Sequence, residues 1–312
     1  MKRLTAQPAL WSWLAALAVW LVTISVSHGQ GAGDILTAAL TFSAFTVLVS
    51  LGQMLVITTG PGNVDLSIPS TIALSSAVSM LVMNENAAMI VLGLVAAILA
   101  GVLVGCFNYG LIRLLSIPPI IATLSSSLIV MSVAISNGRG LKIKPPRMFG
   151  DAVTAHPFGV SVLAVVALCA ALIVVFVLRR TVYGRTVSAI GQNMQAAHLA
   201  GLNVPATRFL TYVISGALAG LTGALIAGFA GGNSLDQGEE YLLLTIAVVV
   251  IGGTNVAGGR ASVAGIGGAA MFMFLLVAML NTAGAGAGLR MLLTGLIIIG
   301  VITLAGGEKG GR

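Results

Sequence analysis

Residues 179–208, RRTVYGRTVSAIGQNMQAAHLAGLNVPATR, form a long polar segment in a chain that otherwise consists of one apolar stretch after another. Asn193 is a good N-cap residue and Gly201 a good residue to end a helix, so the pattern predicts a helix of about two turns over MQAAHLA. A helix this short is marginal in water and needs a surface that holds it. We expect that surface to be the protein's own bundle, the lipid, or a groove in a partner protein. The segment has one predicted apolar side, because apolar residues recur at i, i+3, i+7 and i+10: Val187, Ile190, Met194 and Ala197.

The composition is that of a membrane protein. Apolar residues make up 58% of the 312 residues and charged residues 7%, against about 25% charged residues in an average soluble domain. The formal net charge of +7 does not indicate nucleic acid as a partner, because the basic residues fall mostly in short loops, where they set membrane topology. Cys106 and Cys169 lie inside apolar runs, which favours small buried side chains over disulfide or metal-ligand roles.

The apolar stretches approach the ~20 residues that are needed to cross a bilayer. The first is too long for the apolar core of a signal peptide, so we assign it as the first transmembrane helix. The third contains Pro69 and the eighth is short, so both depart from an ordinary span. The chain, residues 1–312, is therefore predicted to be a single all-α, polytopic transmembrane domain with about ten helices. The predicted spans are 9–27, 35–59, 66–83, 88–114, 118–136, 158–178, 208–230, 240–252, 262–281 and 289–305.

An even number of spans places both termini on the same side of the membrane. The distribution of basic residues favours the cytoplasm as that side. The polar segment 179–208 then also lies in the cytoplasm. The loop at about 137–157 is an exception, since its basic cluster falls outside; its length and prolines suggest an external docking loop. In this orientation Lys2, Arg3, Arg113, Arg179, Arg180, Arg185, Arg208, Arg260, Lys309 and Arg312 lie inside, and Arg139, Lys142, Lys144, Arg147 and Arg290 lie outside.

The acidic residues agree with this orientation. Most of them fall in the external loops, and Asp65 is the carboxylate that lies near the membrane interior. Asp34, Glu85, Asp151, Asp236, Glu239 and Glu240 are outside, and Glu308 is inside.

Glycine is abundant, at 40 of the 312 residues. In lipid, small residues allow helix backbones to approach closely. Gly216 and Gly220 stand at GxxxG spacing, and Ala224 and Gly228 repeat the small pair. This pattern predicts tight helix packing within one bundle, while other glycines would let a helix break or bend.

The stretch TTGPGNVDLSIPS, residues 58–70, interrupts an apolar run. Its Pro-Gly pair breaks the helix, Asp65 or Ser67 can cap the next one, and Pro69 is tolerated in a first turn, where its missing N–H would have no partner. Non-helical backbone at membrane depth occurs only where it is buried in protein or lines a wet cavity. Asp65 is therefore a helix cap, part of a transport path or gate, or both.

A second interruption, IGGTNVAGGRASVAGIGGA at residues 251–269, resembles the first at scattered positions and suggests an internal repeat. Paired breaks in corresponding halves of a chain are a feature of transport pathways. Arg260 in this stretch is either a cytoplasmic anchor or a contact residue. The candidate helix-breaking and gating residues are Gly60, Pro61, Gly62, Gly252, Gly253 and Asn255.

Polar side chains within the predicted spans are candidates for a solute path. Several hydroxyl groups follow one another on the fifth span, and they either bond the i−4 carbonyls of their own helix or line a path for a hydroxylated solute. Asn108 is costly in lipid unless it faces protein or water. The candidate set is Asn63, Asp65, Ser67, Asn108, Thr123, Ser125 and Ser126.

The sequence contains no phosphate loop of the GxxxxGK[ST] type, no HExxH or GxSxG motif and no cluster of metal ligands. His28, His156 and His198 lie in loops, so an intramembrane histidine relay is not expected. We therefore predict that the chain is not an enzyme, and that energy for uphill transport would come from a partner or from an ion.

Several stretches, taken in order, resemble the sugar-type permeases of bacterial ATP-binding-cassette (ABC) importers, a group that includes ribose, xylose, arabinose and autoinducer-2 permeases. The family commonly has GGIDLSVG where this chain has GNVDLSIP, so Pro69 replaces a glycine and should stiffen the entry to the helix. The matching stretches are GPGNVDLSIPS (60–70), IPPIIATL (117–124), YGRTVSAIGQNMQAAHLAGLNV (183–204), YVISGALAGLTGAL (212–225) and VVVIGGTNVAGGRASVAGIGGA (248–269).

The resemblance implies a permease of the bacterial inner membrane, with a type II importer-like bundle, broken helices and a cytoplasmic coupling helix at residues 193–201, approached from Gly184. It implies three partners: a second permease copy or paralogue, a cytoplasmic ATPase that holds ATP and Mg²⁺, and a periplasmic solute-binding protein. This chain itself would bind no cofactor. The implied coupling residues are Gly184, Arg185, Ala189, Gly191, Asn193, Ala196, Ala197 and Gly201.

Other functions stay open at this point. Asp65 and the paired breaks would also suit an ion-coupled secondary transporter, the solute of an ABC permease need not be a sugar, and a membrane scaffold needs no transport at all. A pentose, another monosaccharide, a polyol or a related metabolite all fit the sequence.

Overall fold

The computed structural model describes residues 8–27, 29–138, 140 and 143–306. The regular elements in this part of the chain are helices, and seven of them are long and apolar enough to cross a membrane. The α-helices are α1 (Pro8–Val26), α2 (Ala32–Thr58), α3 (Ile68–Met83), α4 (Ile90–Leu114), α5 (Pro119–Gly138), α6 (Arg147–Thr154), α7 (Val162–Arg180), α8 (Val182–Gln192), α9 (Met194–Leu199), α10 (Val204–Ala230), α11 (Tyr241–Ile251), α12 (Val263–Thr282) and α13 (Ala287–Gly306), with short 3₁₀ helices η1 (Ala87–Met89), η2 (Pro157–Gly159) and η3 (Leu235–Gly238).

The all-helical, polytopic class is confirmed. The predicted stretches 66–83, 240–252 and 289–305 also form helices, namely α3, α11 and α13. These are not among the seven long spans, so the count of ten crossings stays a prediction. Some residues used to predict the orientation or a histidine relay lie outside the described residues: Lys2, Arg3, His28, Arg139, Lys142, Glu308, Lys309 and Arg312.

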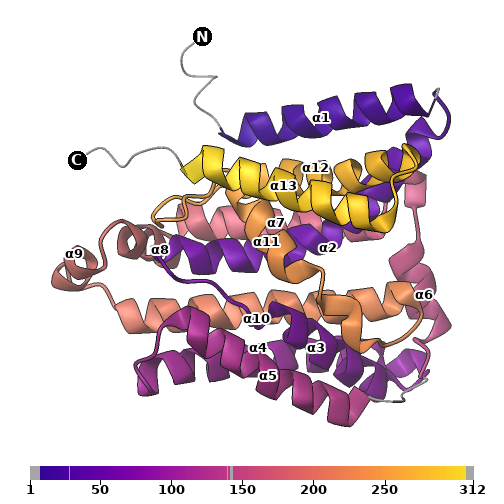
Figure 1. Cartoon of the computed structure of the whole chain (residues 1–312). Helices are drawn as coiled ribbons and strands as arrows, with labels where there is room; N and C mark the ends of the chain where they lie inside the picture. Colours follow the sequence, from indigo (N-terminus) through magenta and orange to yellow (C-terminus); the bar gives the residue numbers. More distant parts are fainter. Residues whose placement is uncertain (1–7, 28, 139, 141–142, 307–312) are drawn as a thin grey trace.

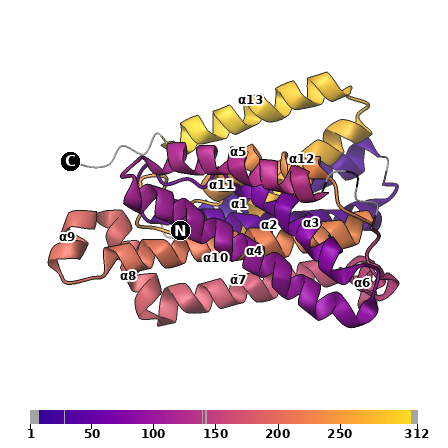
Figure 2. The same cartoon turned by 90° about the horizontal axis from the view of Figure 1, so that it is seen from below.

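Helix α10 lies at the centre of the bundle, with α4 packed along it (Figures 1 and 2). Small residues let the two backbones touch. A Cβ atom on Gly101 of α4 would overlap the carbonyl oxygen of Gly216, and one on Gly220 would overlap the carbonyl oxygen of Ala97. The predicted role of the GxxxG pair in tight packing is confirmed, and α4 is its partner.

Helices α2 and α3 pack against α10 on either side of the first interruption. Helix α1 packs on α12, where the Ser12 hydroxyl donates to the Gly265 carbonyl at 3.1 Å and the Trp13 indole N–H donates to the Ala264 carbonyl at 2.9 Å. The first apolar stretch is thus part of the bundle.

Helices α8 and α9 form one end of the molecule, and α6 lies at the other (Figure 1). The first residue of α1 and the last residue of α13 lie at the α8–α9 end (Figure 1). In the predicted external loop, Phe149 and Val153 anchor α6 through buried side chains, and the Phe149 ring occupies the space above Gly228. The two polar segments therefore lie at opposite ends of the spans.

The close crossing of α4 and α10 at Gly101 and Gly216 can be tested by substitution. In Gly101→Ala the new methyl group meets the backbone of α10, and overpacking of this kind costs about 1–3 kcal/mol. We expect a lower unfolding temperature for this variant in detergent. Gly110→Ala is the matched control, since a Cβ atom there meets open space on the same helix. Equal unfolding temperatures for the two variants would contradict the crossing.

Candidate functional site

The first interruption is a true break in the helices. Residues 59–67 separate α2 from α3 without regular helix. Gly60 and Gly62 have φ values of 128° and 75°, a region that favours glycine. Pro69 lies in the first turn of α3. The predicted break and the predicted place of this proline are confirmed.

A buried carboxylate stands at the centre of the break. Asp65 is 2% exposed. Its Oδ1 accepts from the backbone N–H of Ser67 at 3.0 Å and from the Ser67 hydroxyl at 2.6 Å. Its Oδ2 accepts from the Ser215 hydroxyl of α10 at 3.0 Å. Both carboxylate oxygens are therefore used by donors of the chain itself.

Amide side chains extend this network to two further helices. Asn108 of α4 donates through Nδ2 to the Ser67 hydroxyl at 2.7 Å and lies 3.4 Å from Asp65 Oδ1. Gln53 of α2 accepts from the Asp65 backbone N–H at 3.1 Å. The break is thereby fixed to α2, α4 and α10 at once.

Thr123 of α5 supports the break from the other side. Its hydroxyl oxygen accepts from the Leu66 N–H at 3.1 Å and lies 2.9 Å from the Pro119 carbonyl, four residues earlier in the same helix. Ser126 is buried but its hydroxyl has no partner among the described residues, and Ser125 is exposed on α5. Among the hydroxyl groups on this span, that of Thr123 contacts the break directly, and that of Ser127 donates to the Ser70 hydroxyl of α3 at 3.1 Å.

Asn63 faces a different neighbour. Its Nδ2 donates to the Gly60 carbonyl at 3.1 Å, and its Oδ1 accepts from Nη2 of Arg208 at 2.6 Å. From the sequence, Arg208 is predicted only as a basic residue at the start of a span, and Gln53 and Ser215 are not among the predicted site residues. The isolated amide of Gln53 in an apolar run is a signal that could have been used, because a buried amide needs partners.

The second interruption lies against the first. Residues 252–262 separate α11 from α12, and Gly253, Gly258 and Gly259 have positive φ values of 86°, 92° and 80°. The Gly259 N–H donates to the carbonyl of Thr58, the last residue of α2, at 2.9 Å. The Asn255 side chain accepts from the Ala257 N–H at 3.0 Å and closes the turn.

Helix α8 touches both breaks through Gly191. A Cβ atom on this residue would overlap the Thr58 carbonyl oxygen and the Gly259 nitrogen. At the start of α8, the Tyr183 hydroxyl is 2.9 Å from the Thr211 hydroxyl of α10. Burial raises the pKa of Tyr183 to about 12, although its hydrogen bond with Thr211 lowers the pKa in part, so the phenol stays protonated in this contact. The polar segment is thus joined directly to the broken helices.

The predicted capped helix is present as α9. The Asn193 side chain accepts from the Ala196 N–H at 2.9 Å, and Gly201 follows the helix with φ 79°. The eleven-residue helix α8 before it was not predicted as a separate element. Among the predicted coupling residues, Gly184, Gly191 and Ala197 are buried, Ala189 is partly buried, and Arg185, Asn193, Ala196 and Gly201 are exposed.

Three of the four residues on the apolar side predicted for this segment pack on the bundle. Val187, Ile190 and Ala197 are 0%, 1% and 5% exposed. In contrast, Met194 is 50% exposed and Leu199 is 87% exposed. The surface open to a partner is therefore α9 with Leu199, which the hydrophobic spacing did not single out.

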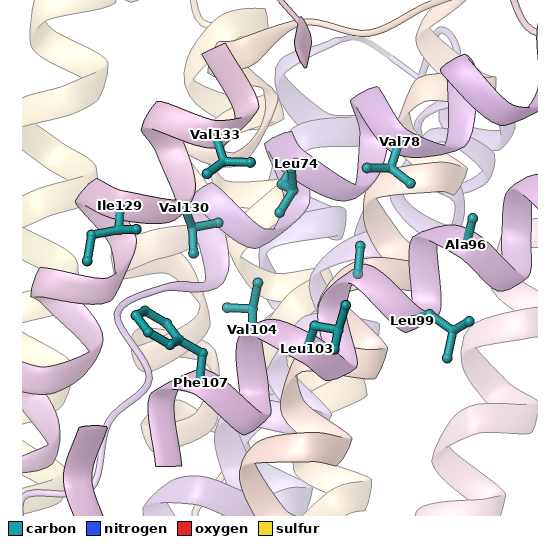
Figure 3. Close-up of a pocket in the computed structure, with 11 residues that line it drawn as sticks. Leu74, Val78, Ala96, Leu99, Leu103, Val104, Phe107, Ile129, Val130 and Val133 are labelled. Atoms are coloured by element: carbon teal, nitrogen blue, oxygen red, sulfur yellow. The ribbon is translucent and has the colours of Figure 1, made fainter. Parts of the chain in front are cut away.

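An apolar groove of about 580 Å³ lies between α3, α4 and α5. Figure 3 shows Leu103 and Phe107 of α4 on one side of the groove, and Val130 of α5 with Leu74 of α3 on the other. Its lining residues carry no polar side chain, and a hydroxylated solute needs hydrogen-bonding partners. The groove is suited to lipid rather than to a polar solute.

Comparison with known proteins identifies the family of this chain. Residues 35–302 match the family described as "Branched-chain amino acid transport system / permease component". The chain belongs to this permease family.

Relatives of this permease include transport proteins with named solutes. It is 30% identical over 310 residues to the autoinducer 2 import system permease protein LsrC of Enterobacter sp. (strain 638), covering 98% of this chain and 89% of the relative. It is 27% identical over 307 residues to the fructose import permease protein FruF of Bifidobacterium longum (strain NCC 2705), covering 92% and 84%. It is 30% identical over 223 residues to the L-arabinose ABC transporter permease protein AraH of Azospirillum brasilense, covering 71% and 65%. No solved structure matches the chain.

The Asp65 network predicts a stability effect in the permease. Asp65→Ala leaves the donors of Ser67 and Ser215 without their acceptor, and each buried unsatisfied donor costs about 1–3 kcal/mol. We expect a clear loss of thermal stability in detergent. Asp151→Ala removes an exposed carboxylate on α6 and should change stability by less than about 0.5 kcal/mol. Similar losses in both variants would rule out a special role for the network.

Proposed function

We propose that this chain is the transmembrane subunit of an ABC importer for a monosaccharide or a related small polar solute. The family match and the import permeases among its relatives support this function. The structural observation that carries it is the contact of Gly191 with both breaks, because an importer needs a cytoplasmic segment that acts directly on the helices forming its gate.

In this proposal α8 and α9 form the coupling segment. The exposed side chains of Arg185, Met194 and Leu199 would dock in a groove of a cytoplasmic ATPase, as helices do in partner grooves. The ATPase would hold ATP and Mg²⁺. ATP binds the two states of the complex with different affinity, and this difference drives alternating access. Displacement of α8 would reach Thr58 and Gly259 through Gly191.

The same proposal includes a second permease copy or paralogue, a periplasmic solute-binding protein and about ten crossings of the inner membrane. Both termini would lie in the cytoplasm with α8 and α9. Arg113, Arg179 and Arg180 support this orientation, since they lie in the last turns of α4 and α7 at the same end and basic residues favour the cytoplasmic side. Loop 137–157 with α6 would face the solute-binding protein.

Asp65 in this proposal holds the break and does not contact solute. Both of its oxygens accept hydrogen bonds from the chain, and a solute would have to displace those donors. Ser125, exposed on α5, remains the candidate for solute contact where a second copy covers that helix.

Uptake in proteoliposomes tests the function. The permease, its ATPase and the solute-binding protein are reconstituted together, and labelled sugar is measured inside the vesicles. We expect uptake that requires ATP and all of these components. Uptake driven by an ion gradient, without ATP or the ATPase, would instead indicate a secondary transporter.

The exposed tip of α9 predicts an assembly defect. Leu199→Asp places a charge on the proposed docking surface, and we expect the ATPase to be lost on co-purification while membrane insertion is kept. Met148→Asp is the control, since Met148 is 70% exposed on α6 at the opposite end. Retention of the ATPase by Leu199→Asp would argue against docking through α9.

Substitution of Gly191 is expected to impair uptake rather than assembly. Gly191→Ala forces α8 away from Thr58 and Gly259 without changing the exposed surface of α9. We therefore expect the ATPase to co-purify normally, while ATP-dependent uptake falls at least roughly tenfold, as small misplacements of positioning contacts commonly cause. Gly110→Ala serves again as the control. Full uptake by Gly191→Ala would show that the contact does not transmit motion.

A further inference from the structure

A second cavity, of about 220 Å³, lies where α4 ends and α10 begins, next to α9. Its polar lining consists of Tyr109 and Arg113 of α4, Ser116 of the following turn and Arg208 of α10. None of its lining residues is a carboxylate. The cavity therefore gathers hydrogen-bond donors and two positive charges without a negative partner.

Arg208 is only partly exposed. One end of its guanidinium group donates to Asn63 at 2.6 Å, and its Nε is buried without a partner among the described residues. A neutral amide compensates a half-buried charge poorly. Arg113 is exposed at the end of α4, where a basic residue is expected from membrane topology. The same reason does not account for the partly buried position of Arg208.

The start of α10 adds to the positive potential. Val204 and Pro205, the first residues of this 27-residue helix, line the cavity, and the N-terminal end of a helix carries a partial positive charge that favours anions. A ligand that fits is one with several acceptor oxygens and a negative charge. Paired guanidinium groups recognise phosphate in this way.

We propose that this cavity binds a phosphate group, either from an anionic phospholipid or from free phosphate. Leu114 and Leu115, which directly follow Arg113, are 83% and 60% exposed, so an acyl chain attached to the phosphate has an apolar surface beside the cavity. Basic pockets between transmembrane helices bind anionic headgroups on the cytoplasmic side. The bound phosphate compensates Arg208 and, through Asn63, steadies the first break.

Thermal unfolding of the purified permease in non-ionic detergent tests the proposal without any transport assay. Dioctanoyl phosphatidylglycerol is titrated against dioctanoyl phosphatidylcholine, and sodium phosphate against sodium chloride at equal ionic strength. We expect a saturable rise in unfolding temperature with phosphatidylglycerol, because a ligand that binds only the folded state stabilises it. A rise with sodium phosphate alone would identify free phosphate as the source.

Variants assign the effect to the cavity. Arg113→Gln together with Arg208→Gln should abolish the rise. Two single variants should fold normally: Arg113→Gln, because its position is exposed, and Tyr109→Phe, because it keeps the ring. We expect Arg113→Gln alone to weaken phosphate binding roughly tenfold. The matched control is Arg179→Gln with Arg180→Gln, which removes the same charge from the exposed end of α7.

The proposal is overturned if neither phosphatidylglycerol nor phosphate raises the unfolding temperature of the unaltered protein. It is equally overturned if the α7 control loses the rise as the cavity variants do, since the effect would then be one of general surface charge. Because the readout is binding, failure here leaves the transport function untouched, and failure of ATP-driven uptake leaves the phosphate site untouched.

Discussion

The buried carboxylate of Asp65 is the interaction on which the arrangement of the helices depends. A break in a membrane helix exposes backbone groups that lipid cannot satisfy, and here Gln53 and Thr123 accept from that backbone while Asp65 accepts from Ser67 and Ser215. The polar network needs close helices. Gly52, next to Gln53, lies against the backbone of Ser215, so the glycine contacts and the polar contacts belong to one interface. Loss of the glycine contacts would move the helices apart and break the polar contacts, and loss of the polar contacts would loosen the glycine packing.

The ends of the two breaks and α8 meet through backbone atoms. Gly60, Gly191, Gly258 and Gly259 approach one another so closely that a Cβ atom on Gly191 or Gly258 would meet backbone. A contact made by side chains can absorb a displacement by changing rotamers, whereas packed backbone passes it on, because interiors at this density are not freely deformable. A displacement of α8 therefore acts on the end of α2 and on the turn between α11 and α12 together.

Much of this fold follows from the sequence, and its limits have physical causes. The long spans are predictable because length and apolar content alone define them, and Asn193 and Gly201 mark α9 through capping chemistry that is local. The partner of Asp65 was not predictable, since Ser215 is 150 residues away and no local pattern records that distance. The spacing of Val187, Ile190 and Ala197 showed an apolar side but not what covers it. Their burial on the bundle leaves Leu199, together with Met194, as an exposed apolar residue of α9, a result that only the folded chain provides.

In the part of the chain that the structure describes, some buried polar atoms beside the same break lack hydrogen-bond partners. Gln53 Nε2, Asn108 Oδ1 and the Tyr212 hydroxyl are buried without partners among the described residues. Each such group costs about 1–3 kcal/mol. This cost destabilises the arrangement in which these atoms have no partner. An arrangement of the break that admits water recovers part of the cost while giving up some of the bonds to Asp65. Because the two terms oppose each other and are of similar size, two such arrangements of the break would differ little in free energy. A modest difference in the affinity of a partner for the two arrangements is then sufficient to select between them.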